Sequence, residues 1–260
     1  MIDPFLEAEY NNSAKVPEAA DIVAEWIRAA ADFRASHAHA EFDVAYGPSG
    51  RQVVDMFWPD AGRDGPIAMF IHGGYWQRLD KSFVSHLAAG LNAHGVAVAM
   101  PSYDLCPAVT LAVLTGQLRA ASRFLRARHG RFDLAIGHSA GGHLAAMLLA
   151  ADLVPAAMPI SGLFDLRPLV HTTVNDGVHF DAAEAWRLSP LALPRPPGRV
   201  HALVGGNEGG EYANQSRRLA RGWGGRWEVL PGHDHFTIPG DLASPNSAMV
   251  AIARGLLPPV

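Results

Sequence analysis

The chain has 260 residues, of which 49% are hydrophobic and 18% are charged, so it can bury a substantial core. The formal net charge of −4 provides no basic surface for a nucleic acid, and no apolar run reaches the roughly 18 residues that a membrane helix needs. The single cysteine, Cys106, excludes an internal disulfide, and the N-terminus lacks the pattern of a secretion signal. These features favour a soluble cytoplasmic protein.

Strand and helix patterns alternate along most of the chain. A first helix is expected over residues 17–36, where Ile22, Trp26, Ala29 and Phe33 recur at helical spacing. Strand patterns then occur at 53–59, 66–74, 96–104, 131–139, 156–162, 199–206 and 226–232, and helix patterns at 107–129, 140–151, 211–223 and 247–257. This alternation predicts a single α/β domain over residues 1–260, with a mostly parallel central sheet covered by helices on both faces.

One long segment, residues 163–198, interrupts this alternation. It contains many prolines and has no clean period, and a connection of this length within a compact domain is often functional. Its aromatic residues Phe164, Phe180 and Trp186 favour a packed structure. We therefore expect residues 163–198 to form a small cap.

The segment "AIGHSAGGHLAAM" (135–147) contains the candidate nucleophile. Gly137-His138-Ser139-Ala140-Gly141 fits G-x-S-x-G, the nucleophile elbow of α/β-hydrolases, between a predicted strand and a predicted helix. Small residues flank the serine because it sits on a sharp turn, where side chains would collide with the strand and the helix. The alternative interpretation is a glycine-rich helix cap. We predict that Ser139 is a nucleophile.

A serine nucleophile needs a base and an orienting acid, in the chain order Ser, acid, His. His235 follows the last predicted strand, with His233 as the alternative; we favour His235 because a position further beyond the strand reaches back over the serine more easily. For the acid, Glu208 and Glu211 both follow the penultimate strand. We favour Glu208, in a tight glycine-rich loop, since Glu211 can begin the next helix. Asp234 is a further candidate.

The segment "FIHGGYW" (70–76) follows an early strand and contains two adjacent glycines. Preorganised backbone N–H groups stabilise the oxyanion that forms during acyl transfer, and glycine permits the close approach that this needs. We assign this role to the N–H groups of Gly73, Gly74 and Ala140. An ordinary glycine turn is the alternative, and His72 is expected to brace the loop.

Together these residues resemble the arylformamidase (kynurenine formamidase) branch of the α/β-hydrolases, which lies close to the hormone-sensitive-lipase-like esterases. "HGGYW" looks like the formamidase form, because the esterase relatives usually carry three glycines after the histidine. Other segments that look like formamidase sequence are "EYNN", "GHSAGGHLAA", "ISGLFDLRPLV", "EYANQSRRLA" and "GHDHF". The resemblance implies a triad of Ser139, Glu208 and His235. The chain departs from it at Glu208, where many relatives have Asp, and at Asp234, where Asn is common.

The family reaction is the hydrolysis of N-formylkynurenine to kynurenine and formate, so the resemblance implies a formyl-enzyme on Ser139. Aromatic pocket walls suit an anilide, and core packing is the alternative role for each candidate wall residue. Those candidates are Tyr75, Trp76, Phe164, Trp186 and Phe236.

Three other functions are consistent with parts of the sequence. A carboxylesterase for small or aromatic esters would use the same machinery with a different pocket. A non-catalytic binding protein could keep the fold without turnover. "HAH" (37–39) and "HDH" (233–235) suggest a metal hydrolase, although no HExxH motif is present. We expect a small-molecule substrate, neither metal nor cofactor, and no nucleic-acid or membrane partner; a homodimer stays open.

Overall fold

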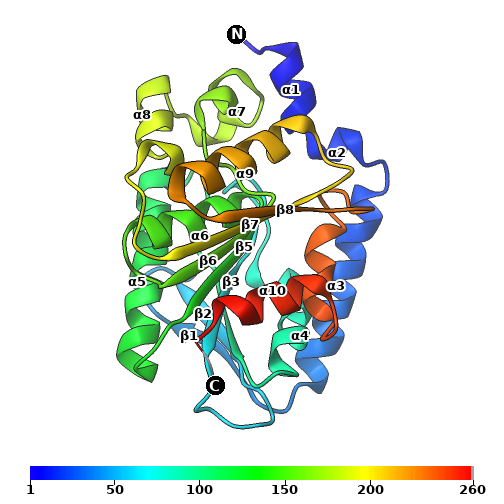
Figure 1. The fold of residues 1–260 in the computed structure, drawn as a ribbon, viewed down its shortest axis with the longest axis vertical. Helices are drawn as coiled ribbons and strands as arrows, with labels where there is room; N and C mark the ends of the chain where they lie inside the picture. The colour runs from blue at the N-terminus through cyan, green and yellow to red at the C-terminus, as the bar shows by residue number, and fades with distance from the viewer. Residues whose placement is uncertain (259–260) are drawn as a thin grey trace.

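The computed structural model describes residues 1–258 and places an eight-stranded sheet between two layers of helices (Figure 1). The sheet order is β1-β2-β4-β3-β5-β6-β7-β8, and all neighbours are parallel except β1–β2 and β2–β4. The strands are β1 (Ala40–Ala45), β2 (Val53–Phe57), β3 (Ile67–Ile71), β4 (Ala97–Pro101), β5 (Leu134–His138), β6 (Ala156–Ile160), β7 (Arg199–Gly205) and β8 (Arg226–Leu230). The predicted fold class, α/β with a mostly parallel sheet, is confirmed.

Helices cover both faces of the sheet (Figure 1). One face carries α3 (Ala19–Ser36), α4 (Ala89–Asn92) and α10 (Ala248–Leu256), and the other carries α5 (Leu111–His129), α6 (Ala140–Ala150) and α9 (Gly210–Trp223). Strand residues alternate between the two cores, as β3 demonstrates. Ile67, Met69 and Ile71 belong to one core, whereas Ala68 and Phe70 belong to the other. The sheet is therefore buried on both sides, and the carboxyl ends of its parallel strands meet at one edge of the sheet.

The helix expected from residue 107 begins later, at Leu111, because the Thr110 hydroxyl caps it by accepting a hydrogen bond from the Val113 N–H at 3.3 Å. β1 was not predicted. It lies at the sheet edge, its residues are only partly buried, and a register shift interrupts it near Asp43. Its sequence, AEFDVA, alternates apolar and polar residues from Ala40 to Val44, but the register shift breaks the matching alternation of burial.

Two short N-terminal helices were also not predicted. They are α1 (Pro4–Tyr10) and α2 (Asn12–Lys15), and the Asp3 and Asn11 side chains cap their first turns. Helices of this length have too few residues for a 3.6-residue period to emerge. In Figure 1 they lie near α9, at the end of the molecule where the loops after the parallel strands gather.

Residues 163–198 pack closely on the core that contains α6 and α9. Their short helices are α7 (Asn175–Val178) and α8 (Ala182–Arg187), with one 3₁₀ turn before α7 (Arg167–His171) and one after α8 (Pro190–Ala192). Leu166, Leu169 and Phe180 are buried in that core. Among residues 1–258, no helix combines the length and apolarity needed to cross a membrane.

Candidate active site

Ser139 occupies the turn between β5 and α6 with φ +56° and ψ −120°, a conformation that L-residues rarely adopt. A Cβ at Gly137 would lie 2.0 Å from the Gly141 carbonyl oxygen, and a Cβ at Gly141 would lie 2.0 Å from the Ile71 carbonyl oxygen. Any side chain at either position would thus collide with backbone. The turn places Ser139 at the N-terminus of α6, whose partial positive charge favours a developing anion.

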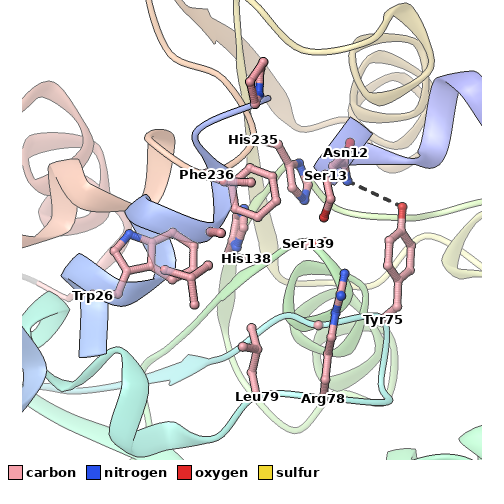
Figure 2. A pocket seen from close by; sticks show the side chains of 15 residues that line it. Asn12, Ser13, Trp26, Tyr75, Arg78, Leu79, His138, Ser139, His235 and Phe236 are labelled. Carbon is pink, nitrogen blue, oxygen red and sulfur yellow. Dashed lines mark hydrogen bonds between the residues drawn. The ribbon is translucent and has the colours of Figure 1, made fainter. Parts of the chain in front are cut away.

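Glu208 and His235 come together from the loops after β7 and β8. The His235 Nδ1–H donates to Glu208 Oε2 at 2.7 Å, and the Glu208 side chain is only 1% exposed. Glu208 Oε1 accepts from the Ser161 hydroxyl and, at 2.6 Å, from the Gly205 N–H. Because Nδ1 donates to the carboxylate, Nε2 is the unprotonated nitrogen of a neutral His235. His235 and Ser139 line the same cavity, shown in Figure 2.

Aromatic rings hold His235 in place. Its ring packs between His138, at a centroid distance of 4.7 Å, and Tyr212, at 4.8 Å. Burial, with a smaller contribution from His235, moves the pKa of His138 well below its usual value. A neutral His138 places no positive charge beside His235.

The alternative acid and base residues have other partners. His233 Nε2 lies 3.6 Å from Asp241, while Asp234 accepts hydrogen bonds from the Phe236 and Thr237 N–H groups within its own turn. Glu211 lies in the first turn of α9 and accepts from the Tyr10 hydroxyl at 3.2 Å. The geometry thus brings Glu208, and not Glu211 or Asp234, to His235.

The loop after β3 approaches Ser139 closely. A Cβ at Gly73 would lie 3.1 Å from the Ser139 Cβ, and Gly74 has φ +98°. His72 braces this loop, as expected: its Nδ1–H donates to the Gly73 carbonyl at 2.9 Å, and its ring stacks on Tyr103 with centroids 4.4 Å apart. Burial lowers the pKa of His72 to about 4, so this brace is uncharged at neutral pH. Gly73 therefore lies beside Ser139, and Gly74 lines the same cavity as the serine; their role as oxyanion donors stays a prediction.

A cavity of about 540 Å³ opens over Ser139. Of the predicted aromatic walls, Tyr75 and Phe236 line it. In Figure 2, Trp26 and Phe236 lie on one side of Ser139, and Tyr75 and Arg78 lie on the other. Most of the other lining residues come from the N-terminal segment and the loop after β3: Asn12, Ser13, Pro17, Ala19, Ala20, Val23, Gly74, Leu79 and His138.

The other three predicted wall residues lie outside this cavity, so those predictions were wrong. Trp76 is fully buried and packs edge-on against His143 in the core, with a left-handed backbone (φ +61°). Phe164 is buried in the core beside Gly162. Trp186 is 38% exposed and packs under the Arg167 guanidinium, 4.1 Å away. The cavity is lined instead by residues between 12 and 26 and by the loop after β3, with none from 163–198.

A buried polar network joins the N-terminal segment to this loop. The Tyr75 hydroxyl donates to the Tyr10 carbonyl at 2.6 Å and lies 2.8 Å from the Tyr212 hydroxyl. Asn12 Nδ2 donates to the same Tyr212 hydroxyl at 2.7 Å. The segments "EYNN" and "EYANQ" therefore meet each other at the site. Their resemblance to formamidase sequence was the signal that could have indicated the N-terminal part of the cavity wall.

The two histidine pairs considered for a metal site are in different environments. His37 Nε2 donates to the Trp58 carbonyl at 3.0 Å, and His39 lies 3.8 Å from Asp60, far along the chain from His233 and His235. Within residues 1–258, no group of three or more His, Cys, Asp or Glu side chains has an arrangement that could hold a metal ion.

The sheet order, the serine elbow and the loops at the carboxyl ends of the strands define an α/β-hydrolase. The BD-FAE family model matches residues 54–153. The chain is 30% identical to a kynurenine formamidase of Salmo salar over 219 residues, which cover 75% of this chain and 74% of the relative. A kynurenine formamidase of Drosophila melanogaster is 28% identical over 245 residues, which cover 82% of this chain and 80% of that protein. The chain belongs to the kynurenine formamidase family, a family of hydrolases.

Solved structures agree with this fold. A protein from Silicibacter sp. TM1040, provisionally described as a thioesterase, superposes with a TM-score of 0.90 at 36% identity, covering 96% of this chain and 98% of that one. Esterase B from Lactobacillus rhamnosis superposes with a TM-score of 0.70 at 19% identity, covering 94% and 95%, which supports the fold alone.

Proposed function

We propose that this protein is a serine hydrolase that cleaves an aryl formamide, N-formylkynurenine, to kynurenine and formate. One observation carries the proposal: Glu208 accepts a 2.7 Å hydrogen bond from His235, and His235 lines the same cavity as the strained Ser139. Glu208 orients the ring, His235 acts as base and Ser139 as nucleophile.

In the first half of the reaction, His235 Nε2 takes the proton of the Ser139 hydroxyl as Oγ attacks the formyl carbon. The carbonyl π electrons move to oxygen, and the resulting oxyanion faces the N–H groups of Gly73, Gly74 and Ala140. When the tetrahedral intermediate collapses, the C–N bond breaks and His235 gives its proton to the aniline nitrogen. Kynurenine leaves, and the formyl group remains on Ser139 as an ester.

In the second half, His235 takes a proton from water as the water oxygen attacks the formyl ester. Collapse breaks the bond to Oγ, and His235 returns the proton to Ser139. Formate leaves. One water is consumed for each formamide cleaved, and the enzyme regains its starting protonation state.

The cavity walls suit the aromatic leaving group. Trp26 and Phe236 have ring centroids 6.2 Å apart, and together with Val23 and Leu79 they form an apolar flank beside Ser139. An anilide ring bound there would be removed from water, and aromatic contacts add to the free energy of that burial. The kynurenine formamidases of the family provide the second line of support.

A carboxylesterase is the alternative, because the same nucleophile, base and acid would also cleave an ester held in this cavity. We would compare kcat/KM for N-formylkynurenine with kcat/KM for p-nitrophenyl acetate. The proposal expects the formamide to be the better substrate. A ratio strongly favouring the ester would assign the protein to the esterases instead.

Labelling by a fluorophosphonate separates an enzyme from a non-catalytic binding protein. We expect one stoichiometric adduct, located by mass spectrometry on the peptide that contains Ser139, and no adduct in Ser139→Ala. Failure of the wild-type protein to label would contradict nucleophilic catalysis by Ser139.

We further propose that the protein works in the cytoplasm on this small-molecule substrate. Cys106, the single cysteine, is buried and free, which suits a reducing compartment. Fractionation of source cells, followed by detection of the chain in the soluble fraction, tests this proposal.

A further inference from the structure

A second hollow adjoins the cavity over Ser139. Its volume is about 300 Å³, and it shares five lining residues with the first: Asn12, Ser13, Gly74, Tyr75 and Arg78. Its remaining lining residues include Glu7, Gln77, Thr173 and Val174. A molecule whose reactive group lies at Ser139 can therefore extend past Arg78 into this second space.

Arg78 stands at the border between the two spaces. Its side chain is exposed, and no carboxylate of residues 1–258 lies within ion-pair distance of its guanidinium. Nearby Arg51, by contrast, is paired with Asp80 at 3.3 Å. The five N–H donors of the Arg78 fork are thus available to a ligand.

The loop holds Arg78 at a set position relative to the oxyanion glycines. The Arg78 N–H donates to the Gly74 carbonyl at 3.2 Å, and a Cβ at Gly74 would lie 2.3 Å from the Arg78 carbonyl oxygen. In Figure 2 the guanidinium extends toward the space beside Ser139, on the same side as Tyr75. One rigid turn therefore presents backbone N–H groups to the reacting carbonyl and a cation to a more distant part of the same substrate.

Glu7 places a negative charge in the second hollow. Its carboxylate is held by the Thr173 N–H at 2.8 Å and the Thr173 hydroxyl at 2.7 Å. Burial acts to raise its pKa, but these hydrogen bonds outweigh that effect and keep the pKa below its usual value. Glu7 is therefore ionised at neutral pH. The hollow contains one anion and one cation that are not paired with each other.

We propose that this second hollow binds an α-amino acid head group, with Arg78 on the carboxylate and Glu7 facing the ammonium. This inference rests on the proposed function and deepens it, because it assigns recognition of the two charged groups of the substrate to Arg78 and Glu7. A guanidinium matches a carboxylate with two parallel N–H···O bonds, so Arg78 would recognise the charge and orient the ring over Ser139.

The test compares substrates that differ only in the head group. N-formylkynurenine carries both charges, N-formylkynuramine lacks the carboxylate, and the deamino analogue lacks the ammonium. Arg78→Gln is expected to lower kcat/KM for N-formylkynurenine and for the deamino analogue by about 10- to 100-fold, mainly through KM, and to change N-formylkynuramine by no more than about twofold. Glu7→Gln is expected to weaken the two amine-bearing substrates and to leave the deamino analogue unchanged.

Arg123→Gln is the matched control, because Arg123 is exposed on α5 and its substitution removes the same charge elsewhere. We expect it to leave all three kcat/KM values unchanged. Equal losses on N-formylkynurenine and N-formylkynuramine in Arg78→Gln would overturn the carboxylate assignment.

Binding of kynurenine to Ser139→Ala, measured by calorimetry, separates this inference from the proposed reaction. If Arg78→Gln in that background weakens kynurenine binding about 10-fold or more while wild type cleaves no formamide, the head-group site stands and the proposed reaction fails. If wild type cleaves N-formylkynurenine and Arg78→Gln changes neither turnover nor kynurenine binding, the reaction stands and the head-group site is refuted.

Discussion

Replacing Glu208 by Gln tests how the site controls the protonation of His235. The Glu208 carboxylate is surrounded by three donors: the His235 Nδ1–H, the Gly205 N–H and the Ser161 hydroxyl. The amide of Gln has only one oxygen to accept hydrogen bonds from these donors, whereas the carboxylate has two. If that oxygen stays on the Gly205 N–H, the amide NH₂ faces Nδ1, and the proton of His235 must move to Nε2. His235 then has no free nitrogen to take the serine proton.

The reverse orientation of the amide is also unfavourable. With its oxygen on His235, its NH₂ would face the Gly205 N–H, and an unsatisfied buried donor costs about 1–3 kcal/mol. We therefore expect the amide to adopt the orientation that inverts the His235 tautomer, and kcat to fall on the order of 10⁴-fold. Stability should change little, because the substitution conserves shape and the Gly205 hydrogen bond.

Steady-state kinetics on the best substrate, with thermal unfolding as the check on folding, measure this effect. Glu211→Gln is the matched control, since Glu211 lies three residues away and bonds to Tyr10 and Asn214 instead. We expect it to keep kcat within about threefold of wild type. If Glu208→Gln kept more than about one tenth of the wild-type kcat, or if both variants lost activity equally, the assignment of Glu208 would be refuted.

Three further outcomes are expected. Ser139→Ala should lower kcat by about 10⁴-fold or more in steady-state kinetics, and its thermal unfolding should show that it folds normally; retained turnover would contradict the nucleophile assignment. Gly141→Ala should lower the free energy of unfolding by about 1–3 kcal/mol or prevent folding, because its Cβ would meet the Ile71 carbonyl at 2.0 Å; a wild-type denaturation midpoint would show that the turn relaxes. Burial lowers the pKa of His72 and of His143 to about 4, from 6.5, so their stabilisation is complete above pH 6.5 and is lost as the pH falls toward 4. His143→Leu should therefore reduce the slope of unfolding free energy against pH in that window by up to about 1.4 kcal/mol per pH unit, and an unchanged slope would mean that His143 is protonated in the folded protein.

The candidate catalytic residues were readable in the sequence where local geometry demands particular residues. Gly137 and Gly141 are required by backbone contacts within a strand, a turn and a helix that are consecutive in the chain. The order of Ser139, Glu208 and His235 follows the order of strands whose carboxyl ends share one edge of the sheet. The choice between Glu208 and Glu211 also followed a local cue, since a carboxylate in the first turn of a helix is stabilised there.

The walls of the cavity were not readable in this way. Phe164 and Trp186 were expected there because they lie in a long irregular segment, yet that segment packs into the core on the α9 side. Trp26 was expected at helical spacing with other apolar residues of its helix, and it is buried there. That spacing does not indicate which loops of the sheet the helix packs beside, so it did not place Trp26 at the cavity. Such contacts depend on how distant segments dock.

By itself, the sequence determined the alternating α/β architecture, the serine elbow and the residues that can act as acid and base, because periodicity and close backbone contacts act over a few residues. Only the tertiary structure decided what surrounds that chemistry. Tyr10 and Asn12 lie about 200 positions from Tyr212, and a hydrogen-bond network between buried side chains brings them together at the site. No local pattern encodes a contact of that separation, since the entropy lost in closing so long a stretch of chain is offset only by contacts throughout the fold.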